Sequence, residues 1–247
     1  MHILKNSTIY PSNRTMTKPY EIFDLTESIK TKSYPYYFCL LTTPRNKQDA
    51  LALLWGIAAE IRFIPLSVTN PLAGFIRLTA WREHLSSWGM DNLIDWLNTY
   101  EIYFDETINL KTHWHQYIES ESILLHQSLL LLNPDASPHL KEASKTLGQT
   151  LGLIYLMQGE YKFGFANDHA FKKELAISVN SRLETLKNLT NVPRESRSLF
   201  ALIGYCNNWF RKYAETCHPV TLTEPTIQWA ILQQRIKFWW GDKTLNI

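Results

Sequence analysis

Apolar residues recur along most of this chain at the three- and four-residue spacing that places them on one side of an α-helix. Two stretches show this spacing best: one carries Leu54, Ile57, Ala58 and Ile61, and the other carries Leu78, Trp81, Leu85 and Trp88. Further helices are predicted at about 91–103, 107–132, 138–163, 168–189, 194–216 and 225–240. No segment alternates apolar and polar residues over enough length to predict a strand. The pattern indicates an all-α fold.

Proline and its neighbours mark the boundaries of these helices. Thr43 is predicted as an N-cap with Pro44 at the first helical position, and Thr69 or Asn70 plays the same part before Pro71. The separators NPDASP, TNVP and CHPVTLTEP have the composition of helix–helix connections. We therefore predict a flexible N-terminal segment at 1–20, followed by a single-domain helical bundle at 21–247.

Two stretches are apolar over more than one stripe, which is typical of helices at the centre of a bundle. They are LALLWGIAA from Leu51 and LGQTLGLIYLM from Leu147. We expect the helices at 51–64 and 147–160 to face each other there. Gly148 and Gly152 allow a neighbouring helix or a ligand to approach closely, and helix packing is the commoner reason for such a pair.

The amino-acid composition argues against a nucleic-acid-binding protein, a zinc protein and a disulfide-stabilised protein. The 247 residues are 45% hydrophobic, and 25 Lys and Arg balance 23 Asp and Glu, so the net charge of +2 gives no basic face for nucleic acid. The three cysteines, Cys39, Cys206 and Cys217, are scattered and form no CxxC pair, which indicates neither a zinc site nor a disulfide framework. Aromatic residues make up 13% of the chain, which favours a bulky core or an apolar cavity.

The N-terminal segment and the length of the apolar stretches bear on the cellular compartment of the protein. The first twenty residues contain Lys5, Arg14 and Lys18 and no acid, which fits either a weak organellar presequence or an ordinary terminus. The apolar stretches, such as Leu51–Ile64, fall short of the ~20 residues that cross a bilayer. We expect a cytoplasmic bacterial protein, or a mitochondrial matrix protein if the terminus is a presequence, with no transmembrane segment.

The order of several motifs resembles the squalene/phytoene synthase family. KSYPYYFCLLTTPRNKQDALALLWGIAAEIRFI is similar to the family's entry segment and first aspartate-rich helix, and NPLAGFIRLTAWREHL to its next signature. TLGQTLGLIYLM resembles the helix of the second aspartate motif, and VPRESRSLFALIGYCNNWFRKYAE the penultimate helix. The likeness runs from about residue 30 to 240, and it implies an isoprenoid-synthase-like bundle.

Active members of that family join two prenyl diphosphates, and the leaving diphosphate needs Mg²⁺ held by carboxylates. A DxxxD pair places two carboxylates on one helix face. Here the first motif falls on Arg62, Phe63 and Leu66, and the second on Gly159, Glu160 and Phe163. Neither helix offers a carboxylate pair. We therefore predict no catalytic residues, no metal and no cofactor, with Mg²⁺ required only if the chain is a prenyltransferase.

The segment AAEIRFIPLSVTNPLAGFIRLTAW is closer to a non-catalytic branch of the family. That branch includes a mitochondrial complex I assembly factor and its alphaproteobacterial relatives. The resemblance implies a pseudoenzyme that acts as an assembly or accessory factor, with a protein partner in respiratory-complex biogenesis. The alternatives are an active prenyltransferase that uses a displaced acid such as Glu160, and a passive protein that binds a lipid or isoprenoid ligand.

Three charged residues are candidates for a cleft at the degenerate motif: Glu60, Arg62 and Arg77. Glu60 is either paired there, for example with Arg62 or Arg77, or exposed at the helix end. A separate signal lies near the C-terminus, where Trp229, Leu232, Ile236 and Trp239 share a helix face. Core packing is the default for such a face, but exposure would suit a partner or a peripheral membrane contact.

Overall fold

The computed structural model describes residues 19–105, 109–160 and 162–241. Within these ranges the regular secondary structure is helical throughout, and they contain no β-strand. The predicted all-α class is confirmed. The predicted flexible segment at 1–20 lies outside the described residues, apart from its last two.

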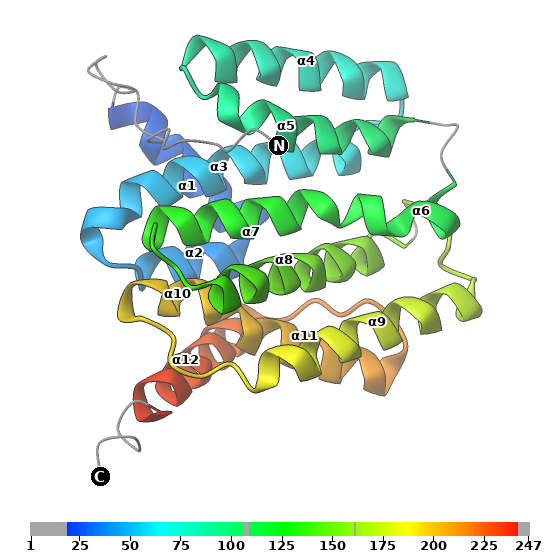
Figure 1. The fold of residues 1–247 in the computed structure, drawn as a ribbon. Helices are drawn as coiled ribbons and strands as arrows, with labels where there is room; N and C mark the ends of the chain where they lie inside the picture. The colour runs from blue at the N-terminus through cyan, green and yellow to red at the C-terminus, as the bar shows by residue number, and fades with distance from the viewer. Residues whose placement is uncertain (1–18, 106–108, 161, 242–247) are drawn as a thin grey trace.

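Figure 1 shows the helices stacked in layers, with α4 at one edge of the molecule and α12 at the opposite edge. The first half contains α1 (Pro19–Lys32), α2 (Tyr34–Leu41), α3 (Arg45–Ser67), α4 (Pro71–Ser87), η1 (Asp91–Leu93), α5 (Ile94–Asn98) and η2 (Thr99–Phe104). The second half contains α6 (Leu110–Tyr117), α7 (Glu119–Leu132), α8 (Pro138–Gln158), α9 (His169–Lys187), η3 (Arg194–Ser196), α10 (Arg197–Phe200), α11 (Leu202–Thr216) and α12 (Glu224–Gly241).

Side-chain caps fix where several helices begin. Asn70 accepts a hydrogen bond from the backbone N–H of Leu72 at 2.9 Å, as predicted for the start of α4. The predicted cap of α3 is wrong by one residue, because Pro44 is its N-cap and Arg45 its first helical residue. The Thr43 hydroxyl instead donates to the Cys39 carbonyl at 3.0 Å, and so closes the preceding turn.

Two long predicted helices are interrupted. The segment predicted as 91–103 consists of η1, α5 and η2, and the described part of 107–132 divides at Ile118 into α6 and α7. Both breaks accommodate large buried side chains. Trp96 is buried, and its indole N–H donates to the carbonyl of Ser120 just after the second break, at 3.0 Å. Ile118 itself is buried against α8, where a Cβ on Gly152 would lie 2.8 Å from its own Cβ.

The centre of the bundle is the α7–α8 pair, which is the most extensively packed pair of described elements (Figure 1). Helix α8 also packs on α9, and α7 packs on α3. The expectation that 51–64 and 147–160 face each other directly needs correction, since the main partners of α3 are α1 and α7. Helices α3 and α8 contact each other through the side chains of Arg62 and Tyr155.

Gly148 and Gly152 serve helix packing at this centre. A Cβ on Gly148 would lie 2.3 Å from the carbonyl oxygen of Glu121, a distance that no packed atom tolerates. Glycine at 148 therefore lets the backbones of α7 and α8 approach closely. The packing interpretation of this pair is confirmed.

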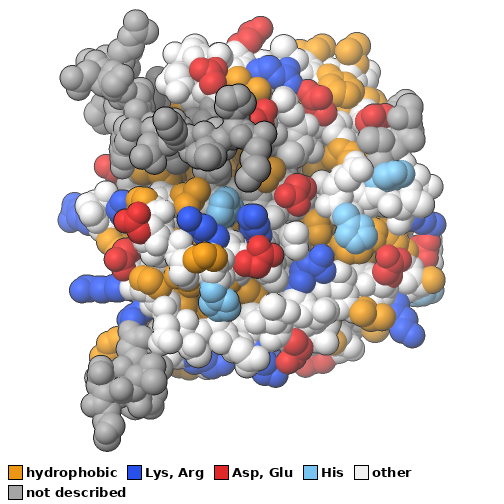
Figure 2. Space-filling model, viewed as in Figure 1, with side chains coloured by type: hydrophobic (Ala, Val, Ile, Leu, Met, Phe, Trp, Pro, Cys, Tyr) orange, Lys and Arg blue, Asp and Glu red, His pale blue; other side chains and the backbone are white. Residues whose placement is uncertain are grey.

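Helix α3 is long and apolar enough to cross a membrane, and it is the only such helix in the part of the chain that the structure describes. Most of its apolar window, 61%, is buried inside the bundle. A helix buried at the centre of a bundle has the same character. On the face shown in Figure 2, acidic and basic side chains are interspersed, as a nearly balanced charge leads one to expect.

Replacing Gly148 by alanine tests the close approach of α7 and α8. We expect Gly148→Ala to lower the free energy of unfolding by about 1–3 kcal/mol through overpacking, because the obstructing atom is a backbone oxygen that cannot rotate away. Urea unfolding measures the change. Lys145→Ala, on the exposed side of the same helix, is the control and should change little. An unchanged or higher midpoint for Gly148→Ala would contradict this packing.

Candidate functional site

The three residues at the degenerate first motif have different surroundings. The Arg62 side chain is 12% exposed. Phe63 and Leu66 are exposed to 46% and 51%. Only Arg62 enters the interior, so these three residues do not line one cleft.

Arg62 forms a bidentate ion pair with Glu121 of α7. Its Nε lies 2.7 Å from Glu121 Oε1 and its Nη2 lies 2.9 Å from Oε2, while Nη1 donates to the Ser33 hydroxyl at 2.7 Å. All three guanidinium nitrogens are thus engaged. The parallel geometry is the strongest form of an arginine–carboxylate contact.

Four aromatic and polar contacts complete this site. The Tyr36 hydroxyl donates to Glu121 Oε2 at 3.0 Å, and the Tyr100 hydroxyl donates to Oε1 at 3.3 Å. The Arg62 Cζ lies 5.0 Å from the centroid of the Tyr36 ring and 4.7 Å from that of the Tyr155 ring. We call the set the guanidinium cluster; its members are Ser33, Tyr36, Arg62, Tyr100, Glu121 and Tyr155.

The electrostatics of the guanidinium cluster favour one positive and one negative charge. Burial by itself lowers the pKa of Arg62, because it disfavours the charged form. The nearby negative charge of Glu121 favours that form, and the pKa of the guanidinium is raised well above its ordinary value. Burial, followed by the charge of Glu121, raises the pKa of Tyr36 and of Tyr100 well above 10.0. The phenols therefore stay protonated and act as hydrogen-bond donors.

This arrangement links elements that are distant in sequence. Arg62 belongs to α3, Glu121 to α7 and Tyr155 to α8, while Ser33 lies between α1 and α2. An anionic ligand would have to displace Glu121 before it could bind the guanidinium, at the cost of leaving a buried carboxylate unpaired. The guanidinium cluster is thus an internal structural site. Its one spare polar atom is the Tyr155 hydroxyl, which is buried and has no hydrogen-bond partner in the described part of the chain.

Glu60 has neither of its two suggested partners. Its carboxylate accepts from the Ser28 hydroxyl and lies 2.5 Å from Lys32 Nζ, both on α1. Arg77 instead donates to the Ser67 hydroxyl at 2.9 Å. The suggested pairing of Glu60 with Arg62 or Arg77 is therefore wrong.

Glu60 and Arg77 do share a surface pocket between α3 and α4, about 250 Å³ in volume. Phe63 and Trp81 also line it. Arg62 is absent from its lining, so the three candidate charges do not form one cleft. Two of them lie on the surface and the third lies in the core.

The residues of the predicted second motif, Gly159, Glu160 and Phe163, lie just after the end of α8. Glu160 is the charged one, and it pairs with a residue of α9. Glu160 is buried, and its Oε2 lies 3.1 Å from Nζ of the buried Lys172 on α9. Neither Glu160 oxygen has a hydrogen bond from the described residues, and Lys172 donates to the Ala166 carbonyl at 3.1 Å. Gly159 caps α8, and a Cβ there would lie 2.5 Å from the ring of Phe163.

Phe163 fills space at this end of the bundle. Its ring centroid lies 5.6 Å from that of Tyr103 and 6.4 Å from that of Tyr117. The two motifs thus hold one buried ion pair each, Arg62–Glu121 and Glu160–Lys172. Neither helix presents a carboxylate pair toward the other.

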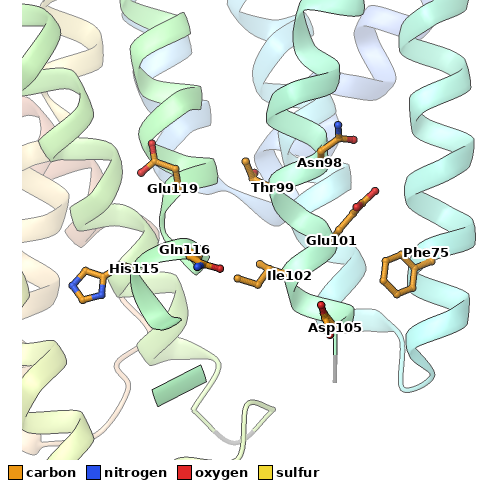
Figure 3. Close-up of a pocket in the computed structure, with 9 residues that line it drawn as sticks. All are labelled: Phe75, Asn98, Thr99, Glu101, Ile102, Asp105, His115, Gln116 and Glu119. Carbon is orange, nitrogen blue, oxygen red and sulfur yellow. The ribbon is translucent and has the colours of Figure 1, made fainter. Parts of the chain in front are cut away.

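Sequence reasoning missed a pocket of about 570 Å³ on another side of the bundle (Figure 3). Figure 3 shows it between α4, α5 and η2 on one side and α6 and α7 on the other, lined by Phe75, Asn98, Thr99, Glu101, Ile102, Asp105, His115, Gln116 and Glu119. Glu101 pairs with Arg82 at 2.5 Å, and burial raises the pKa of Glu119.

Across residues 19–105, 109–160 and 162–241, no three His, Cys, Asp or Glu side chains gather as a metal site would require.

Comparisons of the chain with protein-family models, with curated proteins and with solved structures yield no match. The resemblance to squalene/phytoene synthases therefore rests on the succession of motifs along the sequence. The helical class of the fold agrees with it, but that class is shared by many unrelated families.

A double-mutant cycle measures the coupling within the Arg62–Glu121 pair. Arg62→Met and Glu121→Gln should each lower the free energy of unfolding by about 3–5 kcal/mol, because each leaves a buried charge without its partner. The double variant should lose clearly less than the sum of the two single losses.

The exposed pair Glu184–Lys187 on α9 is the matched control for this cycle. Its coupling should be at most about 0.5 kcal/mol. Equal coupling energies for the two pairs, measured by chemical denaturation, would contradict the buried ion pair.

Alkaline titration tests the burial of the phenols. Burial raises the pKa of seven tyrosine side chains above 10.0: Tyr36, Tyr100, Tyr103, Tyr117, Tyr155, Tyr205 and Tyr213. Since the folded pKa exceeds the unfolded value near 10, the stability they contribute is full below about pH 10 and is lost as the pH rises further. Tyrosinate absorbance of the native protein should show these phenols ionising only as the chain unfolds. In denaturant all 12 tyrosines should titrate together, and the same behaviour in the native protein would refute their burial.

Proposed function

We propose that this chain is a pseudoenzyme of the squalene/phytoene synthase type that acts as an accessory factor in the assembly of a respiratory complex, with complex I as the specific candidate. The proposal combines the order of motifs along residues 30–240 with the way the structure uses the first degenerate motif. It assigns the chain a role through protein contacts and no role in prenyl transfer.

The observation that carries the proposal is the engagement of Arg62. Where the synthases place a catalytic aspartate, this chain has a guanidinium whose three nitrogens contact Glu121 and Ser33 at 2.7–2.9 Å. A guanidinium cannot bind Mg²⁺, and this one is already neutralised within the core. The position has been taken over by an interaction that holds α3 and α7 together.

The main rival, a prenyltransferase with a displaced acid, would rely on Glu160. That carboxylate is buried beside Lys172, and the two groups already neutralise one another. Ionisation of an allylic diphosphate needs several carboxylate oxygens arranged around metal ions, because the leaving group carries several negative charges. One buried and neutralised carboxylate does not supply that arrangement, which favours the accessory role.

A pyrophosphate-release assay tests the loss of prenyl transfer. With Mg²⁺ and farnesyl or geranylgeranyl diphosphate, the purified protein should release no pyrophosphate above background. Glu160→Gln and the exposed control Glu142→Gln should give the same result. Turnover that disappears in Glu160→Gln but persists in Glu142→Gln would support the rival instead.

A deletion strain tests the assembly role separately. Loss of the gene should lower the amount of mature complex I on native gels and cause its subassemblies to accumulate. Both the wild-type gene and the Glu160→Gln variant should restore the complex, provided that the variant folds. Normal complex I in the deletion strain would overturn the assembly proposal, even if prenyl transfer is absent.

A further inference from the structure

Helix α12 exposes an apolar strip on its outer side. Trp229, Leu232 and Ile236 are 59%, 41% and 42% exposed. They follow one another at intervals of three and four residues, so they share one helix face. Trp239 continues this face and is also exposed. We call Trp229, Leu232, Ile236 and Trp239 the α12 strip.

The opposite side of α12 anchors the helix to the bundle. Ile227, Ala230, Ile231 and Phe238 are buried there. The helix packs on α11, α2 and α10, and the Gln228 amide donates to the Tyr34 hydroxyl at 2.6 Å. Figure 1 shows α12 at the periphery of the molecule. These contacts fix the orientation of α12, so the α12 strip faces outward in the folded protein.

Cations flank the α12 strip. At about 100° per residue, Arg235 and Lys237 fall on opposite sides of it. The helix contains no acid after Glu224 up to its end at Gly241. Lys237 is exposed, whereas Arg235 is half-buried, and this burial lowers its pKa.

We propose that the α12 strip docks the protein on the surface of a membrane that contains anionic lipid. Tryptophan and branched aliphatic side chains suit the boundary between headgroups and acyl chains, and flanking Lys and Arg side chains suit anionic headgroups. The inference does not depend on the proposed role in complex assembly.

A second copy of the chain fits this surface less well. In a two-fold pairing of α12 with itself, each residue near the axis faces the same region of the partner helix. Arg235 and Lys237 lie next to the middle of the strip, so two copies would bring four like charges together, and α12 itself has no acid after Glu224 to offset them. An anionic lipid surface offers the opposite charge.

Helix α4 provides a matched control, because Leu72 and Ile76 form another exposed apolar pair. Figure 1 shows α4 at the edge of the molecule opposite to α12. The exposed face of α4 includes Glu83 and has no exposed tryptophan. The α12 strip is therefore the better candidate.

Co-sedimentation of the full chain with lipid vesicles tests the proposal. The protein should bind vesicles made of equal parts phosphatidylglycerol and phosphatidylcholine, and should bind phosphatidylcholine vesicles much more weakly. Trp229→Ser with Ile236→Ser should reduce binding by on the order of tenfold, which corresponds to about 1.4 kcal/mol. Lys237→Glu should reduce binding to the anionic vesicles and leave the weak binding to neutral vesicles unchanged.

Leu72→Ser with Ile76→Ser should leave vesicle binding as in the wild type, and circular dichroism should show that every variant folds. Three outcomes would overturn the proposal. The first is a wild-type protein that does not bind anionic vesicles, and the second is binding that survives in the α12 variants or depends on α4. The third is a dimer in analytical ultracentrifugation that the α12 variants abolish, which would assign the strip to a second copy.

Discussion

The buried Arg62–Glu121 ion pair is the constraint around which this bundle is organised. A guanidinium and a carboxylate can stay charged in a closed core only if each finds the other at good geometry and the remaining polar atoms are hydrogen-bonded. Ser33, Tyr36 and Tyr100 supply those hydrogen bonds. The pair therefore fixes the relative positions of α3, α7 and the segments that contribute these three side chains.

The close contact between α7 and α8 supports the same site. Gly148 faces the backbone of Glu121, so its missing side chain lets α8 approach at the point where the carboxylate turns toward Arg62. From α8, Tyr155 then covers the guanidinium with its ring. A glycine that serves packing and an arginine that serves charge balance thus belong to one arrangement, although they are 86 positions apart in the sequence.

The charged residues of the core and the outer side of α12 differ in character. In the core, Arg62 is paired with Glu121 and Glu160 with Lys172. The outer side of α12, by contrast, combines exposed apolar side chains with flanking cations. These four buried charges thus pair with one another, whereas the α12 strip is exposed.

The sequence by itself determined the helical class and most helix positions, because apolar periodicity and proline caps are local signals. It also showed that Arg62, Leu66, Gly159 and Phe163 cannot act as paired carboxylates. Only the tertiary structure decided that Glu121 is the partner of Arg62, that Lys32 is the partner of Glu60, and that Phe63 and Leu66 face outward. Ion pairs between helices distant in sequence, and the exposure of one side of α12, depend on how the helices pack. No local pattern encodes that packing.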